Sequence, residues 1–199
     1  MAIIWAILLF LLNLAPVVAD ESGDALSRGE GYLAQGLYHQ ALEYLEQVQA
    51  LPRSTTDDQR LVGALGEVYF QLHDVTRAED FLLRASQTPS PRQAHYLNLL
   101  GNLYLGQRRY QDAEQHYRRA LASVQDQPLQ RLAVELNLSR LLPEQQRLEA
   151  LQRLLSQLEV LDGAEDKARL ALNLGEQARP LGASGLALSY RGFEMAHRL

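Results

Sequence analysis

Apolar residues recur every three or four positions over most of the chain, which is the spacing of an amphipathic helix. The pattern is clearest over residues 93–105, where the apolar positions are Tyr96, Leu97, Leu100, Leu103 and Tyr104. A polar stretch over 106–109 separates this helix from a second one predicted over 110–124. Because helices joined by a short turn pack antiparallel, the two segments predict a helical hairpin.

Glycines and alanines repeat at one interval along the chain. Gly29, Gly66 and Gly101 each stand three residues before a tyrosine. An alanine follows each glycine by twelve residues, at Ala41, Ala78 and Ala113. In both sets the interval is thirty-seven residues and then thirty-five. Two residue types that keep one period predict stacked copies of the same hairpin.

The pattern predicts five such repeats, with boundaries at about 22–55, 59–91, 94–127, 130–161 and 164–199. The turns inside them are expected near Gly36, His73, Gly106, Pro143 and Gly182. The first three repeats keep residue type as well as spacing, whereas the last two rest on register and helical pattern. Inside the third hairpin we expect Gly101 to contact Ala113, because two helices cross closely where both lack bulk.

The third repeat resembles the tetratricopeptide repeat (TPR) family. The residues that carry the resemblance are Leu97, Leu100, Gly101, Tyr104, Tyr110, Ala113, Tyr117 and Ala120. The resemblance implies an all-α fold, an α-α superhelical solenoid of about five helical hairpins, with a concave groove lined by the first helix of each repeat. The alternative is an ordinary helical bundle in which the glycines are accidental.

The resemblance also implies where a protein or peptide ligand would bind. The residues at groove positions are Glu30, Arg60, Glu67, Phe70, Gln71, His95, Asn98 and Asn102, followed by Arg140 in the fourth repeat. We expect Phe70 to serve as an apolar anchor, and Asn98 and Asn102 to pair with the backbone of an extended peptide. The alternative is that these side chains are simply solvated.

The first nineteen residues have the pattern of a signal peptide. An apolar run from Ala2 to Leu12 is followed by Pro16 and by small residues that end at Ala19. This predicts cleavage after Ala19, a mature chain over 20–199 that does not span the membrane, and a periplasmic or secreted location in the bacterial envelope. The alternative is an uncleaved N-terminal anchor.

The composition argues against nucleic-acid binding, metal binding and catalysis. A formal net charge of −5 disfavours a nucleic-acid surface, and the chain has no cysteine. The five histidines form no i, i+4 pair, so we expect them at exposed helix or turn positions rather than on a metal. We expect no catalytic residue, no cofactor and no metal site, and therefore no enzyme activity.

The C-terminal helix has two apolar stripes. Leu186, Tyr190, Phe193 and His197 share one face, and the second stripe is formed by Leu188, Met195 and Leu199. A terminal repeat normally carries a polar cap, so we expect the second stripe to mediate self-association or to contact a further domain.

The favoured function is a non-catalytic protein–protein interaction scaffold of the bacterial cell envelope. Secreted chains with degenerate repeats of this kind also resemble the leading region of CHAT-domain (caspase-like) proteins. The alternative is therefore a recognition or regulatory arm of a larger CHAT protease-like enzyme. A nucleic-acid-binding helical repeat is disfavoured by the charge and by the signal segment.

Overall fold

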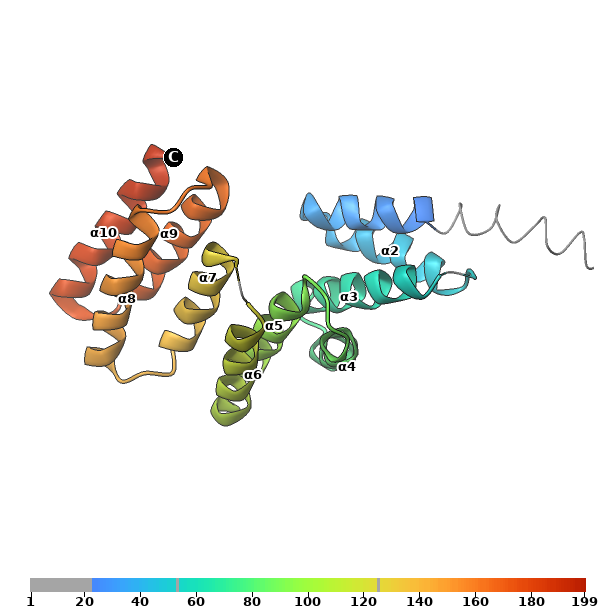
Figure 1. The fold of residues 1–199 in the computed structure, drawn as a ribbon, viewed down its shortest axis with the longest axis horizontal. Helices are drawn as coiled ribbons and strands as arrows, with labels where there is room; N and C mark the ends of the chain where they lie inside the picture. Colours follow the sequence, from blue (N-terminus) through green and yellow to red (C-terminus); the bar gives the residue numbers. More distant parts are fainter. Residues whose placement is uncertain (1–22, 53, 125) are drawn as a thin grey trace, which may run out of the picture. The chain divides into compact units, whose positions relative to one another are not determined.

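The computed structural model describes residues 23–52, 54–124 and 126–199, and the predicted signal segment lies outside these ranges. The described residues are helical at 23–34 and in α2 to α10, and they contain no strand (Figure 1). The labelled helices are α2 (Tyr38–Gln49), α3 (Thr55–Gln71), α4 (Val75–Gln87), α5 (Gln93–Gly106), α6 (Tyr110–Ser123), α7 (Pro128–Ser139), α8 (Glu144–Glu159), α9 (Ala164–Ala178) and α10 (Gly182–Arg198).

The chain divides into two compact units, residues 1–90 and residues 91–199. In the first unit, α3 and α4 form a hairpin that packs on α2. The second unit contains three hairpins, α5–α6, α7–α8 and α9–α10, and each packs on the next. Figure 1 shows α7, α8, α9 and α10 side by side in this second unit. None of the described helices has both the length and the hydropathy that are needed to cross a bilayer.

The turns of the first three repeats share one backbone conformation. A residue with positive φ stands at Gly36, His73 and Arg108, with φ of 74°, 60° and 62°. These positions are separated by the same intervals as the repeats themselves. Only glycine adopts this left-handed conformation without steric cost, so His73 and Arg108 are strained at equivalent points. The predicted turn near Gly106 is present, but Gly106 belongs to α5 and the left-handed residue is Arg108.

The regular spacing of the glycines reflects how the second helix of each hairpin packs on the first. A Cβ atom added at Gly101 would lie 2.3 Å from Cε1 of Tyr117. At Gly66 and Gly29 it would lie 2.9 Å from Leu82 Cδ2 and 2.7 Å from Leu45 Cδ2. Each glycine therefore faces the residue sixteen positions later in the chain.

The structure places Tyr117 against Gly101, and the predicted contact between Gly101 and Ala113 stays a prediction. The three atoms nearest to the missing Cβ of Gly101 all belong to the ring of Tyr117. Ala113 is fully buried, as are its equivalents Ala41 and Ala78. The glycine makes room for a large side chain that lies on the helix backbone, which the sequence pattern did not predict.

His116 does not have the exposed position that was predicted for the histidines. It is buried in α6, and its ring centroid lies 4.9 Å from that of Tyr104. Its Nδ1 lies 2.8 Å from the backbone carbonyl oxygen of Asp112, which can only accept, so Nδ1 carries the proton. The prediction failed because it considered only how the histidines are distributed along the chain. It did not consider which face of its helix each histidine occupies.

The apolar stripe predicted to be exposed on α10 is mostly internal. Leu188 is 3% exposed and, together with the partly buried Met195, packs on the core formed by α7 to α10. The reason lies in Gly185 and Gly192 on the same face of the helix. A Cβ at Gly185 would lie 2.3 Å from the carbonyl oxygen of Ala178, so this face approaches α9 closely. Of the predicted stripe, only Leu199 is exposed.

Candidate functional site

The predicted groove residues fall in both units, and each unit is described by itself. In the first unit the structure brings Glu30 and Arg60 together. Arg60 Nη2 donates to Glu30 Oε2 at 2.6 Å, and Arg60 Nε donates to Oε1 at 3.3 Å. This two-point contact with Glu30 raises the pKa of Arg60. The pair is therefore an ordered surface feature between the first helix of repeat one and the first helix of repeat two.

The other predicted residues of the first unit lie on α3. Glu67 and Phe70 are half-buried, and Gln71 is exposed. Phe70 thus offers part of an aromatic ring to solvent, which is compatible with an apolar anchor.

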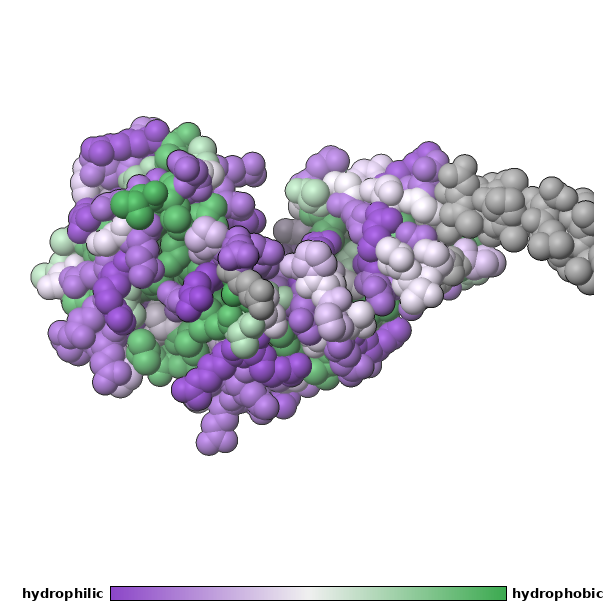
Figure 2. All heavy atoms as spheres, viewed as in Figure 1, coloured by the Kyte–Doolittle hydropathy of each residue, from purple (hydrophilic) through white to green (hydrophobic). Residues whose placement is uncertain are grey.

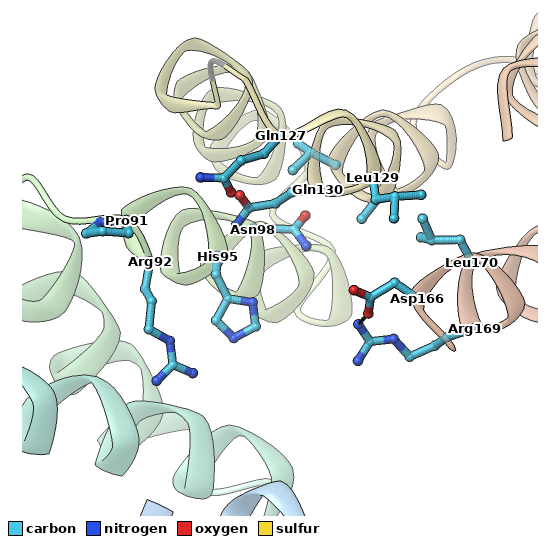
Figure 3. Close-up of a pocket in the computed structure, with 12 residues that line it drawn as sticks. Pro91, Arg92, His95, Asn98, Gln127, Leu129, Gln130, Asp166, Arg169 and Leu170 are labelled. Atoms are coloured by element: carbon cyan, nitrogen blue, oxygen red, sulfur yellow. Dashed lines mark hydrogen bonds and ion pairs between the residues drawn. The ribbon is translucent and has the colours of Figure 1, made fainter. Parts of the chain in front are cut away.

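The second unit contains an open groove with a volume of about 440 Å³ (Figure 3). Its walls come from the starts of α5, α7 and α9, which are the first helices of three successive hairpins. The lining residues are Pro91, Arg92, His95, Asn98, Gln127, Leu129, Gln130, Ala133, Val134, Asp166, Arg169 and Leu170. Two of the predicted residues, His95 and Asn98, lie in this lining, and Asn102 does not.

The groove combines an apolar part with amide groups. Leu129 on α7 and Leu170 on α9 supply apolar surface, while Asn98, Gln127 and Gln130 supply amides (Figure 3). The Oε1 atom of Gln130 is buried and accepts no hydrogen bond from the described residues. A buried acceptor without a donor is costly.

A charged pair lies on the α9 wall of the groove. Arg169 Nη2 donates to Asp166 Oδ1 at 2.5 Å, and both side chains are mostly exposed. Such an exposed pair contributes little to stability. It is accordingly available to exchange partners with a charged ligand.

The two predicted asparagines already have partners within the chain. Asn137 Nδ2 donates to Asn98 Oδ1 at 3.0 Å, and the hydroxyl of Tyr117 donates to Asn102 Oδ1 at 2.7 Å. Each carbonyl oxygen therefore already accepts one hydrogen bond, and it keeps a second lone pair beside the donors of the Nδ2 group. The buried position of Tyr117 raises the pKa of its phenol, so the hydroxyl remains a donor.

Sequence reasoning missed the contributions of α7 and α9 to the groove. Gln130, Asp166 and Arg169 lie in repeats four and five, where the glycine and alanine pattern is weak. The helical spacing of the α7 residues could have predicted this contribution. Gln127, Gln130, Val134 and Asn137 are spaced so that they lie on one face of the helix. Among the described residues, no group of three or more histidine, aspartate or glutamate side chains is placed to hold a metal ion.

Two family models match the chain, and both describe the tetratricopeptide repeat. One covers residues 26–90 and the other covers residues 94–125. The first three predicted repeats are therefore TPR repeats. Proteins with these repeats are generally non-catalytic scaffolds that bind proteins or peptides.

Solved structures give the same fold over nearly the whole chain. BtubC (BKLC) from P. vanneervenii matches with a TM-score of 0.65 at 18% identity, over 94% of this chain and 83% of that one. TPR-like repeats of a putative kinesin light chain from Podospora anserina match with a TM-score of 0.61 at 17% identity, over 90% and 97%. Pseudomonas aeruginosa PilF matches with a TM-score of 0.60 at 21% identity, over 90% and 77%.

These matches confirm the predicted fold class, an all-α helical solenoid of the TPR type. No curated protein sequence shows significant similarity to the chain. The resemblance to CHAT-domain proteins is not among the matched family models and stays a prediction.

Proposed function

We propose that this protein is a non-catalytic scaffold that binds an extended segment of another protein in the groove formed by α5, α7 and α9. The observation that carries the proposal is the open groove itself, whose lining combines apolar side chains with amide groups. A net charge of −5 supports a protein partner over a nucleic acid.

An extended peptide matches the chemistry of this groove. Its backbone presents N–H and C=O groups at regular intervals, and the groove amides include both donors and acceptors. One apolar side chain of the peptide would cover Leu129 and Leu170. Because ordering a peptide costs entropy, a small number of such contacts must carry most of the affinity.

In the first unit, the proposed contacts are Glu30, Arg60, Glu67, Phe70 and Gln71. Phe70 would be the apolar anchor there, and the Glu30–Arg60 pair would supply charged groups. The proposal thus assigns a ligand-facing surface to each unit, and the two surfaces can be tested by separate substitutions.

Selection from a phage-displayed library of random peptides tests the proposal in the second unit. The groove variant combines His95→Ala with Arg169→Ala. The control combines Gln111→Ala with Arg118→Ala on α6, whose outer surface is hydrophilic in Figure 2. The control is closely matched, since Arg118 and Arg169 are 70% and 79% exposed and each is paired with a carboxylate one turn away.

We expect peptides selected by the unmodified chain to bind the groove variant more than tenfold more weakly and to bind the control unchanged. Equal binding to the groove variant would show that peptides do not use this groove. Preferential loss in the control would place the ligand on the outer surface of α6.

The location is proposed from the first nineteen residues. Export to the bacterial envelope with cleavage after Ala19 is supported by the apolar run and the small residues that follow it. N-terminal sequencing of the protein isolated from the envelope fraction should begin at Asp20. A sequence that begins at Met1 would show an uncleaved anchor instead.

A further inference from the structure

The chain has a single lysine, and this residue lies behind the groove rather than in it. Of the 19 lysine and arginine residues, only Lys167 is a lysine. It belongs to α9, where its neighbours Asp166, Arg169 and Leu170 line the groove and Lys167 itself does not. Its side chain reaches back to the end of α8, the preceding helix. Lys167 therefore ties one wall of the groove to the helix before it.

Lys167 binds the connection between α8 and α9 through both its side chain and its backbone. Its Nζ donates to the backbone carbonyl oxygen of Glu159 at 2.9 Å and to that of Leu161 at 2.8 Å. Its backbone N–H donates to the carbonyl oxygen of Gly163 at 3.0 Å. Glu159 is the last residue of α8 and Gly163 is the N-cap of α9, so one residue holds the whole connection. An ammonium suits this task because it carries three donors on one nitrogen.

The connection that Lys167 holds supports the apolar part of the groove. A Cβ atom added at Gly163 would lie 3.0 Å from Cδ1 of Leu129, so the connection contacts this leucine. Leu129 and Leu161 both pack against the core to which Leu170 belongs. In Figure 3, Leu129 on α7 and Leu170 on α9 point toward one another in the lining of the groove. The position of the connection therefore influences the space between these two leucines.

We propose that Lys167 is a positioning residue of the groove, which sets the space between Leu129 and Leu170 for an apolar side chain of the ligand. This inference rests on the proposed function, because it explains how the same groove would select among peptides. Without the ammonium, the carbonyl groups of Glu159 and Leu161 lose their shared donor, and the connection no longer fixes Leu129. A site with a loose supporting residue loses affinity even when every contact residue is present.

Binding of peptides to lysine variants tests this role, and the probes are the peptides that the unmodified chain selects from the random library. Lys167→Met keeps a long, flexible side chain and removes the donors. Lys167→Arg keeps the positive charge but replaces the ammonium with a planar group. We expect both variants to bind groove-dependent peptides about fivefold more weakly or worse, at a temperature at which circular dichroism shows them folded.

The control is Arg191→Met, because Arg191 also ties another helix to the end of α8. Arg191 lies on α10, and its Nη2 donates to Oε1 of Glu159 at 2.9 Å. It does not line the groove. Arg191→Met should therefore leave peptide affinity unchanged, even if it lowers the Tm as much as Lys167→Met does.

A second readout separates positioning from stability. Replacement of the apolar anchor of the peptide with alanine should weaken binding to the unmodified chain. The same replacement should have an effect about threefold smaller or less on binding to Lys167→Met, because the two leucines no longer hold the anchor at a fixed spacing. A lysine that serves only stability would leave the effect of the anchor unchanged.

Unchanged affinity in either lysine variant, an equal loss in Arg191→Met, or an unchanged effect of the anchor would overturn the positioning role. If Lys167→Met does not fold, the affinity of Lys167→Arg and the anchor effect in that variant decide the question. Any of these contrary results with peptides that still depend on His95 and Arg169 would leave the proposed function intact. A library that yields no groove-dependent peptides would contradict the proposed function itself, and the positioning role with it.

Discussion

At the scale of single residues, Tyr117 explains why the third repeat requires a glycine. Its ring lies on the backbone of α5 at Gly101, and its hydroxyl reaches Asn102 one position further along. The first two repeats place a leucine at the same point, so the glycine is needed for close approach whichever large side chain lies opposite.

Replacing Gly101 with alanine should destabilise the protein. Alanine favours the helix by about 0.5–1 kcal/mol, but overpacking a buried contact costs about 1–3 kcal/mol. Because the added Cβ would lie 2.3 Å from the Tyr117 ring, the steric cost should exceed the gain. Denaturant unfolding measures the difference. Gly106→Ala in the same helix is the control and should be neutral or stabilising, since nothing lies within 4 Å of the added atom. A stable Gly101→Ala variant would contradict the packing.

The strained turn residue Arg108 allows an opposite prediction. A non-glycine residue in the left-handed region costs about 1–2 kcal/mol, while glycine loses more entropy on folding. Arg108→Gly should therefore raise the free energy of unfolding by up to about 1 kcal/mol. Gln107→Gly should lower it, because Gln107 has an ordinary φ of −82°. Thermal or denaturant unfolding of both variants checks the sign, and destabilisation by Arg108→Gly would refute the strain.

At the scale of elements, α10 shows what an apolar pattern can and cannot predict. The sequence predicted a helix with two apolar stripes, and the helix is present. Which stripe faces inward depends on the neighbouring helix, and here the small residues Gly185 and Gly192 select the Leu188 side. Leu186 and Tyr190 remain exposed on another part of the helix surface.

A matched pair of substitutions tests the orientation of α10. Leu188→Ala should cost about 2–5 kcal/mol of stability, because Leu188 is only 3% exposed in the core. Leu186→Ala should change stability by no more than about 0.5 kcal/mol, because Leu186 is 56% exposed. Both changes remove the same atoms from the same helix. Equal losses in unfolding free energy would show that α10 is not oriented as described.

The difference between predicting a helix and predicting its packing explains how much of the fold and of the site could be predicted. The first three repeats were predictable because Gly29, Gly66 and Gly101 mark close helix contacts that recur at one interval. Repeat four has no glycine of this kind. Its first helix, α7, ends at Ser139, and Pro143 precedes its second helix, α8. Gln130 and Arg169 were therefore not predicted, although they line the groove beside His95 and Asn98.

At the scale of the whole molecule, stacked TPR-like hairpins present an extended surface, which the proposed function assigns to partner binding. The second unit presents the groove that is lined by residues of α5, α7 and α9. Specificity would then come from a few charged and amide groups on successive first helices, whereas stability comes from the glycine and leucine contacts inside each hairpin. On the groove proposal, partner binding and stability would use different faces of the same helices.

Site-specific photo-cross-linking in the cells that produce the protein tests the central claim most directly. Benzoylphenylalanine is introduced in place of Arg169 in the groove or in place of Arg118 on the outer surface of α6, two positions of similar exposure. The groove proposal predicts covalent adducts with another protein from position 169 and few or none from position 118. Adducts from position 118 that equal or exceed those from position 169, or an absence of adducts at position 169, would contradict it.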